Sequence, residues 1–450
     1  MKAHQVKSEK TSRVVNVFGF IALVSLIVVL AATRVQAQFV TKLTTSNGVP
    51  GDEFGKVAIS GNTVVADART GPLDDTICFF EKDFGGTDAW GEIATQMAFG
   101  ELPGVGFGTT VAISGNTVIT NEHQANPTAG GGARVYIFER NRGGSNAWGG
   151  VTTMRPGNID CLSVDISGDT AIAGYQYDHG GTGAAYILAR NEGGPNNWGK
   201  AAELTASDGE RRDVFGTRSA IDGDTAVVGA WGDDERTGSA YIFQRDEGGA
   251  DSWDEVKKLV ASDRTTGDGF GKHTAISGDT VIVGAANRDD LGVNSGSAYI
   301  FQRNQGGPDN WGQVAKLMGS DVATEHFFGY DVGIDGDLAI VGAPGEGDSN
   351  PGDGQFDGAG SAYIFARHAG GPNNWGEVLK LTAPDAAQSD AFGYYVAISG
   401  STAVVGAPGN AGNTGAAYVF RVPEPSTAIL AVAGLLGVLA LDWQRRKQVS

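Results

Sequence analysis

Aromatic side chains occur together in two of the loops predicted to follow apolar strands, and they are the residues best suited to bind a ligand. The candidates are Tyr175, Tyr177 and His179 in one loop and Trp231 in the equivalent loop of the next repeat. An aromatic ring offers a broad apolar face, and hydroxyl or imidazole groups add hydrogen bonds. We therefore predict that these residues bind sugar rings, with ordinary packing of the loops as the alternative.

Groups that could catalyse a reaction are scattered along the chain. The six histidines occupy unrelated positions of the repeat: His4, His123, His179, His273, His326 and His368. None of them begins a metal-binding spacing, and the sequence contains no nucleophile elbow, phosphate-binding loop or zinc signature. Because catalysis needs titratable groups that converge on one site, the sequence predicts a protein that is not an enzyme.

These loops belong to a unit that recurs every 53 to 64 residues. Its most regular part is an apolar strand, a glycine turn and a second apolar strand, as in VAISGNT at Val57 and TAISGDT at Thr274. The turn glycines are Gly61, Gly115, Gly168, Gly223, Gly278, Gly336 and Gly400. Glycine suits a two-residue hairpin turn because it adopts positive φ without steric cost.

Each unit contains four apolar segments with strand character, which in the fifth unit begin at residues 274, 280, 297 and 313. Sheets with so few charges must bury both faces, and radial stacking against similar sheets achieves this. We therefore predict an all-β fold over residues 38–421, a seven-bladed β-propeller of four-stranded antiparallel blades. The last unit ends at Arg421 without a fourth strand, and FVTKLT from Phe39 to Thr44 matches the missing one. We expect this N-terminal strand to pair with residues 416–420 and to close the ring.

A Phe-Gly pair precedes the first strand of six units, at Phe54-Gly55, Phe107-Gly108, Phe215-Gly216, Phe270-Gly271, Phe328-Gly329 and Phe392-Gly393. Later Val-Gly-Ala and Ala-Pro elements recur at a constant offset, whereas the third unit has Cys161-Leu162 in place of the pair. This pattern resembles the FG-GAP repeat of integrin alpha-chain propellers and many bacterial surface proteins. Six Gly-Gly pairs followed by tryptophan are similar to kelch repeats, and Trp253-Asp254 to WD repeats, but neither family explains the Phe-Gly pairs. We expect each phenylalanine to pack between blades, a structural role.

The resemblance to integrin-type propellers also implies Asp-rich loops that bind calcium through oxygen ligands. The turn between the first two strands is too short for such a site here. The longest insertion instead carries Asp348, Asn350, Asp353 and Asp357. We predict calcium binding at this loop, with a solvated loop as the alternative and loss of stability on chelation as the test.

Both ends of the chain differ from the repeats. Residues 1–37 contain Lys2, Lys7, Lys10 and Arg13, an apolar run at 14–32 and the small-residue pattern Val35-Gln36-Ala37, which is typical of a cleaved signal peptide. An uncleaved anchor helix is the alternative.

Residues 422–450 begin with Pro423, Glu424 and Pro425, followed by an apolar run at 428–441 and a basic cluster at 445–447. This order resembles a PEP-CTERM sorting signal, which implies processing by an exosortase-type transpeptidase and a short transmembrane helix with its basic end in the cytoplasm. A plain tail anchor is the alternative. On either reading, contact with a membrane is limited to the terminal signals.

The net charge of −19 makes the chain strongly acidic, and its terminal segments are basic, so the repeats are more acidic still. Such a surface repels phosphate backbones, which excludes nucleic acid as the expected partner. Cys78 and Cys161 lie in different repeats, and we expect both to be buried apolar residues and not a disulfide framework.

Together these features predict an exported binding or adhesion protein of the cell surface or extracellular matrix of a Gram-negative bacterium. The expected ligand is a surface polysaccharide or a matrix protein. Two alternatives remain: a purely structural matrix component, and a polysaccharide-processing enzyme that uses the blade loops.

Overall fold

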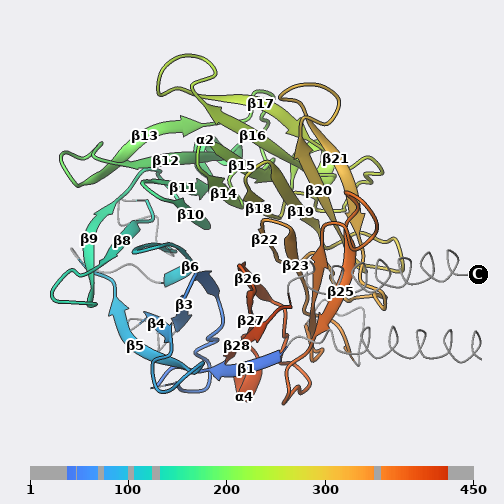
Figure 1. Ribbon diagram of the computed structural model, residues 1–450. Helices are drawn as coiled ribbons and strands as arrows, with labels where there is room; N and C mark the ends of the chain where they lie inside the picture. The colour runs from blue at the N-terminus through green and yellow to red at the C-terminus, as the bar shows by residue number, and fades with distance from the viewer. Residues whose placement is uncertain are drawn as a thin grey trace, which may run out of the picture. The chain divides into compact units, whose positions relative to one another are not determined.

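The structure is a computed structural model that describes residues 38–46, 48–68, 75–99, 106–123, 132–348 and 356–423. Within it, Phe39–Arg421 form one compact unit. The strands of this unit make seven four-stranded antiparallel sheets, which surround a central opening (Figure 1). The predicted all-β, seven-bladed propeller is therefore confirmed.

Each sheet is called a blade here, and its first strand lies nearest the centre in Figure 1. Blade 1 contains β2 (Val57–Ser60), β3 (Thr63–Ala68), β4 (Thr76–Lys82) and β5 (Trp90–Met97); blade 2 contains β6 (Phe107–Ser114), β7 (Thr117–Glu122), β8 (Val135–Arg140) and β9 (Trp148–Met154); blade 3 contains β10 (Ser163–Ser167), β11 (Thr170–Tyr175), β12 (Ala184–Arg190) and β13 (Trp198–Leu204); blade 4 contains β14 (Ser219–Asp222), β15 (Thr225–Ala230), β16 (Ser239–Arg245) and β17 (Trp253–Leu259). Blade 5 contains β18 (His273–Ser277), β19 (Thr280–Ala285), β20 (Ser297–Arg303) and β21 (Trp311–Leu317); blade 6 contains β22 (Val332–Asp335), β23 (Leu338–Ala343), β24 (Ser361–Ala366) and β25 (Gly376–Leu381); blade 7 contains β26 (Tyr395–Ser399), β27 (Thr402–Ala407), β28 (Ala416–Arg421) and β1 (Gln38–Leu43). The short helical turns α2 (Asp178–Gly181), α3 (Asp233–Arg236) and α4 (Asn410–Asn413) follow the second strands of blades 3, 4 and 7.

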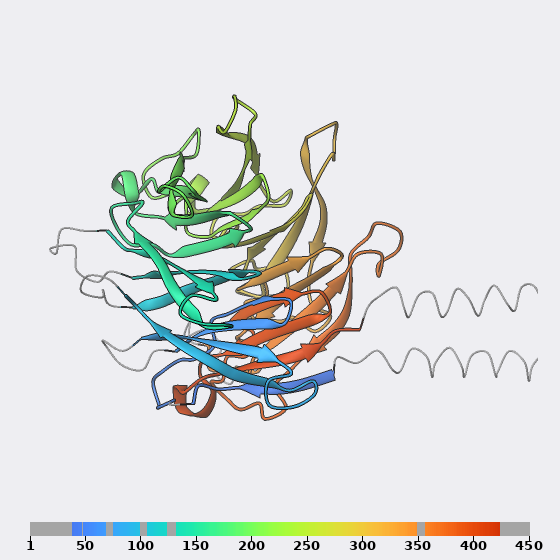
Figure 2. The same cartoon turned by 60° about the vertical axis from the view of Figure 1, so that its left-hand side comes forward.

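The N-terminal strand closes the ring as predicted. The last sheet has the order β1, β28, β27, β26, so the first strand of the chain is the outer strand of the last blade. Both views show β1, in blue, beside the red strands of this blade (Figures 1 and 2). Pairing of β1 with β28 joins the two ends of the repeat array in one sheet and leaves the last blade without an unpaired third strand.

The tight turns between the first and second strands form a hydrogen-bonded collar around the ring. Their glycines have φ between 52° and 59°, and the next residue has no positive φ, as in a type II′ turn. In each turn, the glycine N–H donates to a serine or aspartate side chain at the end of the first strand of the preceding blade. The seven acceptors are Ser60, Ser114, Ser167, Asp222, Ser277, Asp335 and Ser399. The bond from Gly61 to Ser399 Oγ, 3.2 Å long, joins blade 1 to blade 7 and completes the circle.

The apolar core lies between neighbouring blades. Every residue of β15 is buried, and one cluster joins side chains of blades 3 and 4, with Phe215 of the Phe-Gly pair among them. The ring of Phe215 lies edge-on to Tyr241, with centroids 5.6 Å apart, and its backbone forms a bridge with Gly183 of blade 3. The phenylalanine of the pair therefore packs one blade onto the previous one.

The glycine of the pair allows this close approach. Gly216 has φ of +90°, and a Cβ atom there would lie 2.4 Å from the Ala184 carbonyl oxygen. A side chain at this position would force the two blades apart, which explains why glycine follows the packed phenylalanine.

The two ends of the blades form different faces of the ring. Because the strands are antiparallel, the collar turns and the Gly-Gly-Trp loops lie at one end. The loops after the second strands lie at the other end, together with the connectors that lead to the Phe-Gly pairs. We call this second end the upper face, and the described loop residues that were predicted to bind a ligand or calcium belong to it.

Candidate functional site

Of the aromatic residues predicted to bind a ligand on the upper face, only some are exposed to solvent. Tyr175 is the last residue of β11 and is fully buried, with its hydroxyl donating to the Ala133 carbonyl at 2.9 Å. Its ring belongs to the core between blades 2 and 3, so the prediction that Tyr175 contacts a ligand is wrong. Tyr175 is buried because neighbouring blades cover both faces of the second strand, including its last residue. Tyr177, two residues later, is 44% exposed.

The other two predicted residues each contact a neighbour in their own blade. The Nε2 atom of His179 lies 2.8 Å from Glu203 Oε1. The guanidinium of Arg236 lies over the half-buried ring of Trp231, 5.9 Å from its centroid. Binding of a sugar by Tyr177, His179 and Trp231 stays a prediction.

The predicted calcium loop lies partly outside the described residues, because these exclude Asn350 and Asp353. The N–H of Asp348 donates to the Gly345 carbonyl, and the Asp357 carbonyl accepts from the N–H of Ser389. Within the described ranges, no group of three or more His, Cys, Asp or Glu side chains is arranged to hold a metal ion. Calcium at this loop stays a prediction.

The central channel brings together residues that are far apart in the sequence. Its cavity has a volume of about 260 Å³ and is lined by the first strands of all seven blades. The position five residues before the turn glycine lies at the upper end of these strands. The residues at this position are Lys56, Thr110, Ser163, Arg218, His273, Asp331 and Tyr395. The collar below is uniform, whereas this upper ring differs from blade to blade, as expected of a recognition surface on a regular frame.

Four aromatic rings lie together at the upper end of the channel. The Tyr330 ring is 4.6 Å from the Tyr394 ring and 4.9 Å from the Phe356 ring, measured between centroids. The Tyr394 ring in turn lies 4.8 Å from that of Tyr395, which lines the cavity. Tyr330, Tyr394 and Phe356 are only half-buried, so their cluster keeps apolar ring surface accessible beside the channel.

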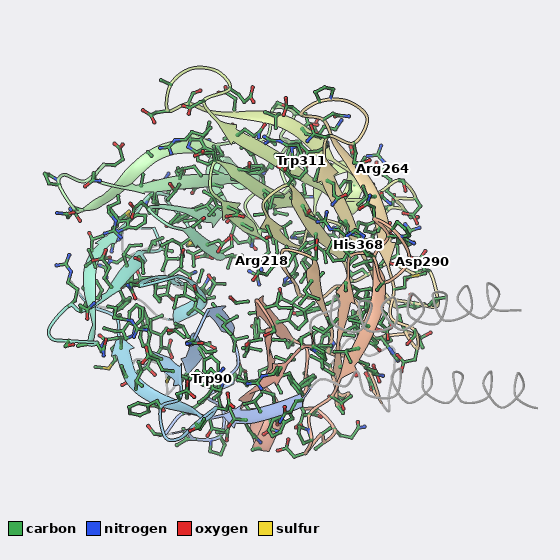
Figure 3. The ribbon with its side chains drawn as sticks, in the orientation of Figure 1. Trp90, Arg218, Arg264, Asp290, Trp311 and His368 are labelled. Carbon is green, nitrogen blue, oxygen red and sulfur yellow. The ribbon has the colours of Figure 1, made fainter. Side chains whose placement is uncertain are left out.

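Three cationic side chains accompany these rings. The Nζ atom of Lys272 lies 5.6 Å from the centroid of the Tyr330 ring, and that of Lys56 lies 5.8 Å from that of Tyr395. Arg218 lines the cavity and donates from Nη1 to the Leu162 carbonyl at 2.8 Å. Figure 3 places Arg218 beside the central opening. We call these three cations and the rings of Tyr330, Phe356, Tyr394 and Tyr395 the channel mouth.

Charges at the channel mouth affect one another. Burial lowers the pKa of Lys272, and the positive charge of Arg218 lowers it further. The pKa of His273 is lowered to about 4, first by burial and then by Arg218. His273 is therefore neutral at physiological pH and a weak base.

The imidazole of His273 forms part of a link between three blades. Its Nδ1 atom lies 2.9 Å from Asp331 Oδ1, and Asp331 Oδ2 accepts a hydrogen bond from the N–H of Val396. These residues come from blades 5, 6 and 7. A histidine and carboxylate pair also occurs in catalytic triads, but here both partners have a positioning role in the ring.

One carboxylate lies inside the channel, at a position where most other blades have alanine. The two oxygens of Asp165 accept hydrogen bonds from the N–H groups of Ile166 and Ile221, both 2.8 Å long. Burial nevertheless raises the pKa of Asp165 from 3.8 to about 7. The equivalent residues are Ala58, Ala112, Ala220, Ala275, Gly333 and Ala397.

Polar networks support the upper face farther from the channel. In blade 4, Tyr241 on β16 and Lys258 on β17 face each other across the sheet. The Lys258 ammonium lies 2.7 Å from Asp208 and 2.6 Å from Asp233, and the Tyr241 hydroxyl donates to the same two carboxylates. Burial opposes ionisation of Asp208, but the hydrogen bonds from Lys258 and Tyr241 outweigh it and lower the pKa of this carboxyl. The network ties the connector before the Phe-Gly pair to the loop after the second strand.

Blades 5, 6 and 7 repeat this network. The tyrosine, lysine, connector aspartate and loop residue are Tyr299, Lys316, Asp263 and Asp290 in blade 5; Tyr363, Lys380, Asp321 and Glu346 in blade 6; and Tyr418, Lys42, Asp385 and Asn410 in blade 7. Lys42 comes from β1, so the closing strand supplies the cation of the last network.

Blades 1 to 3 depart from the pattern. Cys78 replaces the tyrosine in blade 1, while Cys161 stands where blade 3 lacks its Phe-Gly pair. Both thiols are buried and unbridged, as predicted, and burial raises the pKa of each to about 12.

The described residues contain no helix long and apolar enough to cross a membrane. Of the predicted sorting motif, Pro423 is described, whereas Glu424, Pro425 and the apolar run at 428–441 lie outside the described residues, as do residues 1–37.

The channel mouth was not predicted from the sequence. Its residues come mainly from the two positions after each Phe-Gly pair, such as Lys272, Tyr330 and Tyr394-Tyr395. The sequence did contain one signal for this site: the two positions after the Phe-Gly pair vary in chemical type, while the repeat around them stays constant.

A closed ring of seven four-stranded antiparallel blades defines this protein as a seven-bladed β-propeller. Four segments match the FG-GAP repeat family, at residues 198–243, 253–301, 311–365 and 375–420. Each runs from the fourth strand of one blade to the third strand of the next, and together they include the connectors and Phe-Gly pairs of blades 4 to 7. These four segments are thus similar to FG-GAP repeats, whose propeller is typically a non-catalytic fold.

No curated protein is significantly similar to this chain. Among solved structures, the WD40 β-propeller domain of Doa1 matches with a TM-score of 0.47 and 12% sequence identity. That match covers 87% of this chain and 98% of the Doa1 domain.

Proposed function

We propose that this chain is an exported binding protein of the cell surface or extracellular matrix of a Gram-negative bacterium. It holds a surface polysaccharide or a matrix protein at the channel mouth and does not catalyse a reaction. Export rests on the signal peptide expected at residues 1–37. Retention at the surface rests on the expected sorting signal at 422–450 and its exosortase-type transpeptidase.

The observation that carries the proposal is the kind of chemistry that converges at the channel mouth. Ring faces and cations from blades 1, 4, 5, 6 and 7 meet there, and they suit recognition of a sugar or a polar chain. The imidazole in this region, His273, has a lowered pKa and is engaged with Asp331, which makes it a poor general base. This arrangement supports binding over the alternative of a polysaccharide-processing enzyme.

The proposal is tested by binding of the purified full-length protein to arrays of surface glycans and matrix proteins, with and without calcium. The informative variant is Tyr394→Ala, since Tyr394 contacts the three other rings of the channel mouth. Tyr177→Ala is the comparison variant, because Tyr177 is an exposed tyrosine of the same face that belongs to the sugar site predicted in blade 3 and not to the channel mouth. We expect saturable binding that the first variant loses and the second keeps.

Absence of binding on every array would favour the alternative of a purely structural matrix component. Binding lost only in Tyr177→Ala would move the site to the loop of blade 3. Release of shortened glycan products by the wild-type protein would support the enzymatic alternative.

A further inference from the structure

Arg218 and Lys272 differ from the other partly buried cations of the upper face. Lys258, Lys316 and Lys380 each form ion pairs with two carboxylates. In contrast, neither Arg218 nor Lys272 forms an ion pair with a carboxylate among the described residues.

The charges of these two residues also oppose each other, because Arg218 lowers the pKa of Lys272. Asp331 also lines the cavity, but among the described residues it forms no ion pair with either cation, and its two oxygens are engaged by His273 and Val396. Arg218 lines the cavity from blade 4, and Lys272 directly precedes His273, the equivalent residue of neighbouring blade 5. Two like charges at neighbouring positions, neither in an ion pair among the described residues, destabilise the fold. In a chain with a net charge of −19, they also create a local positive site in an otherwise negative field.

The geometry of the channel mouth limits which anionic group can compensate the charges of Arg218 and Lys272. A guanidinium binds carboxylate and sulfate groups through paired N–H donors, and an ammonium adds a third donor to the same anion. The adjacent rings of Tyr330 and Tyr394 offer apolar faces to the part of the ligand that carries the anion. Because Lys272 lies over Tyr330, a group bound to its ammonium would be adjacent to both rings.

The size of the cavity and the overall charge restrict the ligand further. A volume of about 260 Å³ is below the range of about 300 to 1,000 Å³ that is typical of sites for drug-sized ligands, so one sugar unit fits better than a long segment. A densely charged anionic polymer would be repelled by the net charge of −19 that the chain carries. A chain end or an isolated acidic sugar is repelled less, since salt screens charges beyond about 8 Å at physiological ionic strength.

We propose that the channel mouth binds an acidic sugar of a surface or matrix polysaccharide, with its carboxylate or sulfate at Arg218 and Lys272 and its ring against the tyrosines. This inference rests on the proposed function and names the ligand class of the same site.

The test is calorimetric titration of the full-length protein with trigalacturonate and with its methyl ester, which removes the charge but keeps the sugar rings. We expect the acid to bind about tenfold to a hundredfold more tightly than the ester, the range that one or two hydrogen bonds to charged groups provide. Arg218→Gln and Lys272→Gln should each weaken binding of the acid about tenfold and leave binding of the ester unchanged. Arg218→Lys should give an intermediate affinity, because it keeps the charge but loses the paired donors.

Arg264→Gln is the matched control, because it removes one positive charge from an exposed side chain outside the channel mouth (Figure 3). It should change the affinity less than twofold. Sodium sulfate in place of the sugar acid distinguishes a general anion site from a saccharide site, and we expect it to bind far more weakly. Circular dichroism melting curves of each variant show whether a loss of affinity reflects unfolding.

Equal affinity for acid and ester, with both lost in Tyr394→Ala, would overturn the role of charge but leave the proposed function intact. Sulfate as tight as trigalacturonate, or charge-dependent binding of an acidic peptide without any binding of sugars, would overturn the saccharide class. Failure of every glycan and matrix protein to bind would reject the proposed function itself.

Discussion

Replacing Asp165 by alanine should make the stability of the propeller less dependent on pH. Asp165 is the only residue at its repeat position that carries a charge, and burial raises its pKa from 3.8 to about 7. Between these two values, the folded protein holds a proton that the unfolded chain has released. The free energy of unfolding must therefore fall as the pH rises through this window.

The size of the effect follows from the two pKa values. Each pKa unit corresponds to about 1.4 kcal/mol, so a rise from 3.8 to about 7 corresponds to about 4 kcal/mol. The Asp165 carboxylate is partly exposed to the channel, and solvent screening reduces this figure. We expect a pH-dependent loss of about 2 to 4 kcal/mol in the wild-type protein that the Asp165→Ala variant lacks.

Urea unfolding at several pH values between 4 and 8.5 measures this difference. The variant also loses the hydrogen bonds from the Ile166 and Ile221 N–H groups, whose effect on the titration is already contained in the raised pKa of Asp165. Asp169→Asn is the control, since Asp169 is a largely exposed carboxylate in the adjacent turn. Parallel stability curves for the wild type and Asp165→Ala would refute the reasoning, because they would mean that the channel carboxylate is as well solvated as in the unfolded chain.

Three further changes test the frame of the ring. Lys258→Met should lower the free energy of unfolding by about 1 to 3 kcal/mol in urea, because it leaves the buried carboxylate of Asp233 without its ammonium partner; an unchanged value would mean that the network is not stabilising. Phe215→Ala should cost about 3 to 5 kcal/mol in the same assay by opening a cavity between blades 3 and 4, and a loss below about 1 kcal/mol would contradict this packing role. Deletion of residues 38–46 should abolish cooperative thermal unfolding, since it removes β1 and Lys42 from blade 7; a melting curve like that of the full chain would argue against closure by this strand.

The fold could be predicted because its determinants are local and repeat along the chain. A glycine of positive φ at a constant position, such as Gly223, fixes each hairpin, and the unpaired strand at Phe39 fixes the closure. The collar bonds could not be predicted in the same way. Ser60 and Gly115 belong to different hairpins. Only the radial arrangement of the blades brings the Gly115 N atom to 3.1 Å from Ser60 Oγ.

The candidate site was harder to predict, because it depends on which residues the ring brings together. Tyr175 was misjudged because it is two residues from the exposed Tyr177, although it still belongs to a strand covered on both sides. Arg218 and Tyr395 lie at corresponding positions of blades 4 and 7, and nothing in their local sequence indicates a shared site. Only the closed ring places them around one opening.

The same connectors support both the frame and the channel mouth. In blade 6, Asp321 anchors the connector to Tyr363 and Lys380, then Phe328 packs into the core between blades, and Tyr330 follows directly at the mouth. Blades 4 to 7 repeat this order, and they are also the blades whose segments match the FG-GAP repeat. A residue that follows a fixed phenylalanine and a glycine of defined φ has little freedom of position, so its side chain can vary without disturbing the ring. Regular networks in the blades and irregular residues at the mouth therefore both follow from the same connectors, which hold a residue of variable type at a fixed position.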